Sequence, residues 1–132
     1  MAMVRRHKAR CANRKGIRTM AEFLADNGFE IVNVQSVGQD PGTMSVVSLV
    51  IARDASGRFA VIRLDDWTLA RGYRKKDTIP YKIRVEWEGH SREDALNAMT
   101  TARAGMLANF SWFIPGTKEL VPGCRSEKVI EC

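Results

Sequence analysis

At 132 residues the chain has the length of one ordinary domain. Its composition, with 45% hydrophobic and 27% charged residues, is that of a globular protein and excludes an intrinsically disordered one. The longest strongly apolar run covers residues 46–52, whereas a membrane-spanning helix needs roughly 20 residues, so no membrane span is predicted. No apolar segment follows the N-terminal charges, so we predict no secretory signal and a cytoplasmic location.

The positive charge is concentrated at the N-terminus. The first 18 residues contain seven basic residues and no acidic one: Arg5, Arg6, Lys8, Arg10, Arg14, Lys15 and Arg18. Removing these seven from the 21 basic residues leaves 14 against 15 acidic ones, so the net charge of +6 belongs to this segment. Because residues 1–16 lack apolar periodicity, they are predicted to form a flexible basic arm, followed by a single domain over residues 17–132.

The domain is predicted to begin with a short helix. Thr19 and Glu22 fit the capping box of a helix start, and Asn27 with Gly28 supplies a left-handed stop. A strand of mixed burial is expected next, around residues 31–34.

A hairpin is the clearest feature of the middle of the chain. Residues 39–42, which read Gln-Asp-Pro-Gly, form a turn, and residues 43–52 are rich in Val and Ile with little alternation. That composition suits a central strand covered on both faces. A second turn at residues 54–57 returns the chain as a partner strand over residues 58–64.

The cleanest alternation follows Pro80 and predicts a strand with one wet face. One side carries Tyr81, Ile83, Val85 and Trp87, and the other carries Lys82, Arg84, Glu86 and Glu88. Ser91 caps a second helix that runs to about Asn109, and an irregular tail begins at about residue 114, with a short strand at residues 128–130. The expected fold is α+β: an antiparallel sheet of about four strands packed on one face by two helices.

The basic arm favours binding to nucleic acid. Arginine and lysine neutralise phosphates without a folded scaffold, and such segments often become ordered on the nucleic acid. In a helix, Arg6, Arg10 and Arg14 would share one side. The alternatives are a solvated tail, or contact with an acidic protein or a membrane surface.

A second basic cluster provides further candidate phosphate contacts. A loop contains Arg71, Tyr73, Arg74, Lys75 and Lys76, and the Tyr73 ring is of the type that stacks on a base. Lys82 and Arg84 on the following strand would extend this surface, although Glu86 and Glu88 reduce its charge. The alternative is an ordinary charged strand face.

The element order is similar to that of two nucleic-acid modules, the double-stranded-RNA-binding domain and the AP2-like domain, although we assign neither family. The start of the second helix, residues 91–94, contains two acids and would repel phosphate at the place where the RNA module is basic. An AP2-like domain uses its sheet face, for which the chain has suitable residue types: Arg53, Arg58, Arg63, Lys82, Arg84 and Trp87.

Catalytic and metal-binding patterns are incomplete. The acids Asp54, Asp65, Asp66, Glu86 and Glu88 suggest a metal-dependent nuclease, but the lysine that follows the second acid in such sites is missing. A zinc site made from His7, Cys11, Cys124 and Cys132 lacks the paired CxxC spacing. We therefore predict no cofactor, no metal and no enzymatic activity.

Apolar residues near the end of the second helix form a candidate protein interface, made of Met106, Phe110, Trp112 and Phe113. A second copy of the chain or another protein would cover it, and core packing is the alternative. The leading hypothesis is a small non-enzymatic nucleic-acid-binding or regulatory protein that has no membrane partner. A protein-binding adaptor or inhibitor is the second hypothesis, and a nuclease is the third.

Overall fold

A computed structural model describes residues 20–68 and 81–125. The predicted arm at residues 1–16, Thr19 of the capping box, the basic loop with Tyr73 at residues 71–76 and the short strand at residues 128–130 lie outside the described residues.

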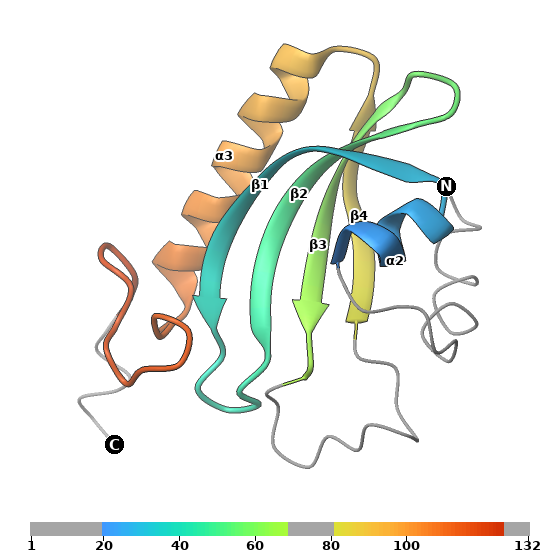
Figure 1. The fold of residues 1–132 in the computed structure, drawn as a ribbon. Coiled ribbons are helices and arrows are strands. Elements are labelled where there is room, and N and C mark those ends of the chain that lie inside the picture. Colours follow the sequence, from blue (N-terminus) through green and yellow to red (C-terminus); the bar gives the residue numbers. More distant parts are fainter. Residues whose placement is uncertain (1–19, 69–80, 126–132) are drawn as a thin grey trace.

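The described chain forms one antiparallel sheet and two helices (Figure 1). In chain order the elements are α2 (Met20–Asp26), β1 (Phe29–Gln39), β2 (Val46–Asp54), β3 (Phe59–Asp66), β4 (Tyr81–Gly89) and α3 (Arg92–Asn109). The strands lie in the order β1-β2-β3-β4, so β1 and β4 are the two edge strands. This arrangement confirms the α+β class and the four antiparallel strands. Neither described helix has the length and apolarity that crossing a membrane requires.

Side chains in the turns explain where the elements begin and end. The Asp54 carboxylate accepts hydrogen bonds from the Ser56 hydroxyl and from the backbone N–H groups of Ser56 and Arg58, which closes the β2–β3 turn. The bond from the Ser56 hydroxyl is the largest cause of a lowered pKa of the Asp54 carboxyl group. Ser91 caps α3 by accepting a hydrogen bond from the backbone N–H of Asp94 at 3.2 Å, as the sequence predicted.

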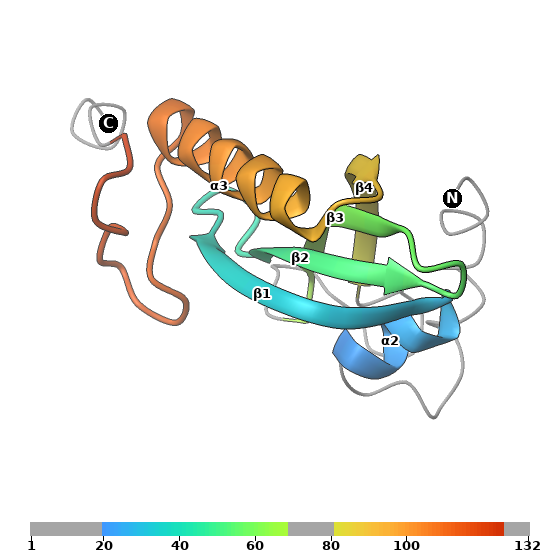
Figure 2. The ribbon, with the colours of Figure 1, turned by 90° about the horizontal axis from the view of Figure 1, so that it is seen from above.

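The two helices lie on opposite faces of the sheet, so the expectation that both pack on one face is wrong (Figure 2). Phe23 of α2 packs with Val50 on one face, whereas Met99 of α3 packs with Leu49 and Ile51 on the other. The physical reason is the two-sided burial of β2: its apolar residues point alternately to both faces, so each face requires its own cover. The predicted burial of this strand on both faces is thereby confirmed.

A β-bulge at Glu86 changes the two faces of β4. Val85 lies opposite Ile62 and Trp87 lies opposite Val61, which leaves Glu86 without a partner on β3. Tyr81, Ile83 and Val85 share one side, as predicted, and this is the side that α2 covers, but Trp87 packs with the α3 side. Glu88 is opposite Ala60, a residue of the α2-side core, so it leaves the face that carries Lys82 and Arg84. The single wet face predicted for this strand is therefore corrected beyond residue 85.

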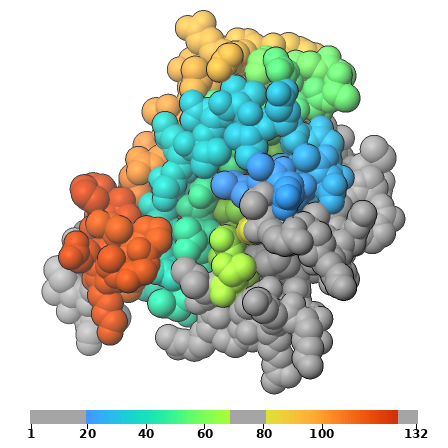
Figure 3. Space-filling model, viewed as in Figure 1, coloured from blue at the N-terminus to red at the C-terminus, as the bar shows by residue number. Residues whose placement is uncertain are grey.

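The segment after α3 packs against the end of β1 (Figures 1 and 3). Phe113 and Gln39 exchange backbone hydrogen bonds of 2.9 and 2.7 Å. This approach requires Gly38, since a Cβ atom there would lie 2.8 Å from the Trp112 Cβ and 3.0 Å from the Phe113 carbonyl oxygen. The tail is therefore held by backbone contacts that a glycine permits.

Two glycine-to-alanine changes are expected to have opposite effects on stability. Gly38→Ala should lower the free energy of unfolding by about 1–3 kcal/mol, because the new Cβ would overlap the backbone of the tail. Gly105→Ala should raise it by about 0.5–1 kcal/mol, because this glycine is inside α3 and its Cβ would meet no atom within 4 Å. Denaturant unfolding of both variants measures the effects, and the same sign for both would contradict this account.

Candidate nucleic-acid interface

On its face of the sheet, α3 leaves part of β3 and β4 open. The helix runs obliquely from the end of β4 towards the end of β1 (Figure 1), and Ala95 and Met99 cover the sheet near Val61. Two adjoining hollows remain beside the later residues of β3 and the earlier residues of β4. They are lined on the sheet side mainly by charged side chains.

The basic side chains of this open face are Arg63, Lys82 and Arg84, which we call the basic strip. Arg63 and Arg84 are directly opposite each other on neighbouring strands, and Lys82 is opposite Asp65. Like charges that face each other across two strands are destabilising. The position of the two arginines therefore needs compensation.

Two carboxylates on the same strands compensate for the arginine pair. Arg63 donates hydrogen bonds of 2.8 and 3.3 Å to the two oxygens of Asp65, and the Nε of Arg84 donates a 2.7 Å bond to Glu86. These bonds engage Nε and one terminal nitrogen of Arg63, but only Nε of Arg84. Among the described residues, the terminal nitrogens of Arg84 have no hydrogen-bond partner, and its side chain is 64% exposed.

Lys82 is held at the other end of the strip by an aromatic ring. Its ammonium nitrogen lies 4.6 Å from the centre of the Trp67 ring, which is a favourable cation–π distance. Trp67 follows directly after β3, so this contact joins the ends of the two strands. The aromatic ring restrains Lys82 without neutralising its charge.

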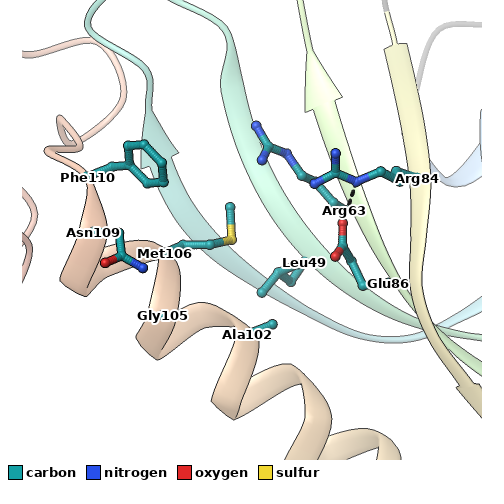
Figure 4. A pocket seen from close by; sticks show the side chains of 9 residues that line it. All are labelled: Leu49, Arg63, Arg84, Glu86, Ala102, Gly105, Met106, Asn109 and Phe110. Carbon is teal, nitrogen blue, oxygen red and sulfur yellow. Dashed lines mark hydrogen bonds and ion pairs between the residues drawn. The ribbon is translucent and has the colours of Figure 1, made fainter.

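The wall opposite the strip is formed by α3 (Figure 4). The Met106 thioether and the Phe110 ring lie on this wall, while the two arginines extend towards it from β3 and β4. Gly105 lines the same wall next to Met106 and has no side chain to fill the space. The hollow has a volume of about 240 Å³, and Phe110 is 54% exposed.

The structure brings together only part of the predicted nucleic-acid set. Lys82 and Arg84 lie on one face, and Arg63, a candidate only through its residue type on the sheet, joins them. Arg53 and Arg58 do not join: they form ion pairs with Glu30 at 2.8 Å and with Glu88 at 3.5 Å.

The four residues of the predicted protein interface divide between surface and core. Phe110 is exposed and Met106 lines the hollow, whereas Trp112 is 4% exposed and belongs to the α3-side core. The indole N–H of Trp112 donates a 3.0 Å hydrogen bond to the Met106 carbonyl. Phe113 is partly buried and pairs with Gln39 through its backbone.

The acidic residues have local partners. Asp65 and Glu86 bind the arginines of the basic strip, Asp66 accepts hydrogen bonds from the backbone and hydroxyl of Thr68, and Asp54 closes its turn. Within residues 20–68 and 81–125, no three His, Cys, Asp or Glu side chains gather as a metal site would require. The residues suggested for a nuclease site therefore do not converge in this part of the chain.

Sequence reasoning missed the paired pattern that builds the strip. Arg63 and Asp65 are two residues apart on β3, and Arg84 and Glu86 are two residues apart on β4. Residues two apart on a strand share a face, so the repeated Arg-x-acid pattern on two strands was the available signal. The role of Gly105 in the hollow was not predicted either, because a single glycine in a helix does not indicate which neighbours it faces.

We compared the chain with protein-family models, with curated proteins and with solved structures. None of the three comparisons finds a match.

Proposed function

We propose that this protein binds nucleic acid through the basic strip and that it acts as a non-enzymatic binding or regulatory protein. The observation that supports this proposal is the pair Arg63 and Arg84, placed directly opposite each other on an open sheet face. Asp65 and Glu86 offset the repulsion between the two arginines, and the Arg84 side chain remains 64% exposed, so its guanidinium group is accessible to an anionic ligand. The planar guanidinium group of arginine fits phosphate oxygens well.

The carboxylates of the strip are compatible with phosphate binding. Asp65 and Glu86 each form an ion pair with an arginine of the same strand, and these ion pairs orient the guanidinium groups over the sheet. Within residues 20–68 and 81–125, no group occupies the terminal nitrogens of Arg84, which can therefore act as donors to a ligand. Lys82 adds a third positive charge, so the five charged residues carry a net charge of about +1 before the arm and the loop are counted.

The basic arm and the loop at residues 71–76 complete the proposal. They hold 10 of the 21 basic residues of the chain and would add further phosphate contacts to those of the strip. A cytoplasmic location suits this role, because nucleic acid and free thiols such as that of Cys124 occur together there.

The test is a fluorescence-anisotropy titration of labelled single-stranded DNA, duplex DNA and structured RNA at two salt concentrations. The double change Arg63→Ala with Arg84→Ala should weaken binding about tenfold or more, since hydrogen bonds to charged groups contribute about 1.5–3 kcal/mol each. It should also reduce the slope of log K against log salt by about 0.7–0.9 for each lost phosphate contact.

The matched control is Arg53→Ala with Arg58→Ala, which removes the same charge from the end of β2 and from the β2–β3 turn. Both arginines of this control are in ion pairs away from the hollows, so binding should change by less than about twofold. Absence of binding to every probe at low salt would contradict the proposed function. Equal losses in the two double variants would contradict the assignment to the basic strip.

An adaptor that docks on a protein, or on a second copy of the chain, is the second candidate. Phe110 and Ile114 favour it, because they are 54% and 38% exposed at the end of α3. Apolar docking is nearly insensitive to salt, whereas phosphate binding weakens steeply with salt. The same two salt concentrations therefore distinguish the two candidates.

A further inference from the structure

The hollow between α3 and the sheet has two walls of different chemistry. The helix wall is apolar, with Met106 and Phe110, and the sheet wall carries the guanidinium groups of Arg63 and Arg84 (Figure 4). Leu49, which is fully buried, lies at its base. A ligand that satisfies both walls has an apolar part and an anionic part next to each other.

The apolar wall is held in place before any ligand arrives. The Phe110 ring meets the buried Trp112 ring nearly edge to face, with a centroid distance of 6.4 Å and an interplanar angle of 77°. Trp112 is fixed by its hydrogen bond to the Met106 carbonyl. More than half of Phe110 nevertheless remains exposed. A fixed and accessible aromatic ring suits stacking, because little side-chain freedom is lost on binding.

The dimensions favour one unit of a polymer over a complete small molecule. The hollow has a volume of about 240 Å³, which is below the range of about 300–1,000 Å³ that is typical of small-molecule sites. A second hollow of about 260 Å³ adjoins it, and both are lined by Arg63 and Arg84. The second hollow continues to Lys82. A polymer with one unit in the first hollow can therefore extend into the second hollow, along Arg63, Arg84 and Lys82.

We propose that this hollow is a subsite for one unpaired base of a single-stranded nucleic acid. The base lies against Phe110 and Met106, its phosphate binds between Arg63 and Arg84, and the next phosphate lies near Lys82. This inference rests on the proposed function and deepens it, since it specifies a single strand and a stacking contact. Asn109 lines the same hollow and offers an amide to the base edge.

The competing ligands use only part of the site. Duplex nucleic acid keeps its bases stacked and paired, so it would contact the arginines but leave the Phe110 ring unused. An acidic peptide would bind the arginines through its carboxylates. Its acidic side chains contain no ring that could stack on Phe110, whereas every nucleotide carries one. The combination of an exposed ring and two arginines favours the single strand.

The test uses the full chain and three labelled probes of equal length: single-stranded DNA, the same strand with abasic sites in place of its bases, and the duplex. The full chain should prefer the strand with bases over the abasic strand. Phe110→Ala should weaken binding of the strand with bases by about fivefold to a hundredfold and remove this preference. Binding to the abasic strand and to the duplex should change by less than about twofold.

Two further variants show whether the hollow itself is used. Gly105→Leu adds a side chain to the helix wall of the hollow, at a position where an added Cβ meets no atom within 4 Å. It should therefore weaken binding of the strand with bases without disturbing the fold. Leu96→Ala removes another exposed apolar side chain from α3 outside the residues that line the hollow, and binding should stay unchanged. Thermal unfolding of each variant confirms that it is folded.

The outcomes separate this inference from the proposed function. If no probe binds at low salt, the proposed function fails, and the base subsite fails with it. If binding depends on Arg63 and Arg84 but Phe110→Ala and Gly105→Leu leave the base preference intact, only the base subsite is overturned. The subsite is also overturned if poly-glutamate displaces the strand with bases as effectively as unlabelled strand does, because the site would then recognise negative charge alone.

Discussion

Phe23→Ala is expected to lower the free energy of unfolding by about 3–5 kcal/mol, the usual loss for a buried phenylalanine. Phe23 is fully buried, and its ring centre lies 5.4 Å from that of Tyr81 on β4. Helix α2 has only seven residues and buries Phe23 and Leu24, so few side chains hold it on the sheet. Because this helix covers the face opposite α3, losing the ring should destabilise the whole sheet.

Guanidinium unfolding measures the change, and Phe110→Ala is the matched control. It removes the same side chain from a site that is 54% exposed, so it should lower the free energy of unfolding by less than about 1 kcal/mol. A large loss for Phe110→Ala with a small loss for Phe23→Ala would contradict the two-sided core. The control also shows whether the variant used in the binding experiments keeps its stability.

Gln39→Leu is expected to lower the free energy of unfolding by about 1–3 kcal/mol. Gln39 is 1% exposed, and its amide nitrogen donates a 2.7 Å hydrogen bond to the Met44 carbonyl. Its amide oxygen accepts a 3.0 Å bond from the backbone N–H of Gly116. Leucine would leave both backbone groups without this partner, and it would loosen the β1–β2 turn and the tail together.

Gln35→Leu is the control for this prediction, because it makes the same change at an exposed position of the same strand. Its effect should stay within about 0.5 kcal/mol. Urea unfolding of both variants gives the comparison. Equal stabilities would mean that the Gln39 side chain does not join the turn to the tail.

Local sequence patterns predicted most of the fold because they act within a few residues. The turn at residues 54–57 and the cap at Ser91 were correct, since each depends on a side chain that bonds to nearby backbone. The end of α3 at Asn109 was also correct. The strand from Phe29 was predicted too short, because its bulges after Ile31 and Ser36 interrupt the alternation that marks a strand.

The placement of side chains on faces depended on partners that a single sequence does not reveal. Residues 81–88 alternate without a break, and only the pairing with β3 makes Glu86 the extra residue that moves Trp87 and Glu88. The two acids expected to reduce the charge of the basic face therefore behave differently. Glu86 binds Arg84, and Glu88 lies on the other face. The sequence therefore indicates the residue types of the candidate site but not their geometry. The binding roles of the strip, the arm and the loop all stay predictions.

Because β4 lies at the edge of the sheet, its charged side chains also affect self-association of the protein. β4 is an edge strand, and within the described residues it pairs only with β3. Exposed edge strands invite pairing with another sheet, and charged residues and bulges are the usual protection against it. Arg84 and the bulge at Glu86 provide both on β4. We therefore expect Lys82 and Arg84, which are proposed to bind nucleic acid, also to limit sheet-to-sheet pairing. Variants that neutralise them should become more prone to aggregate as protein concentration rises.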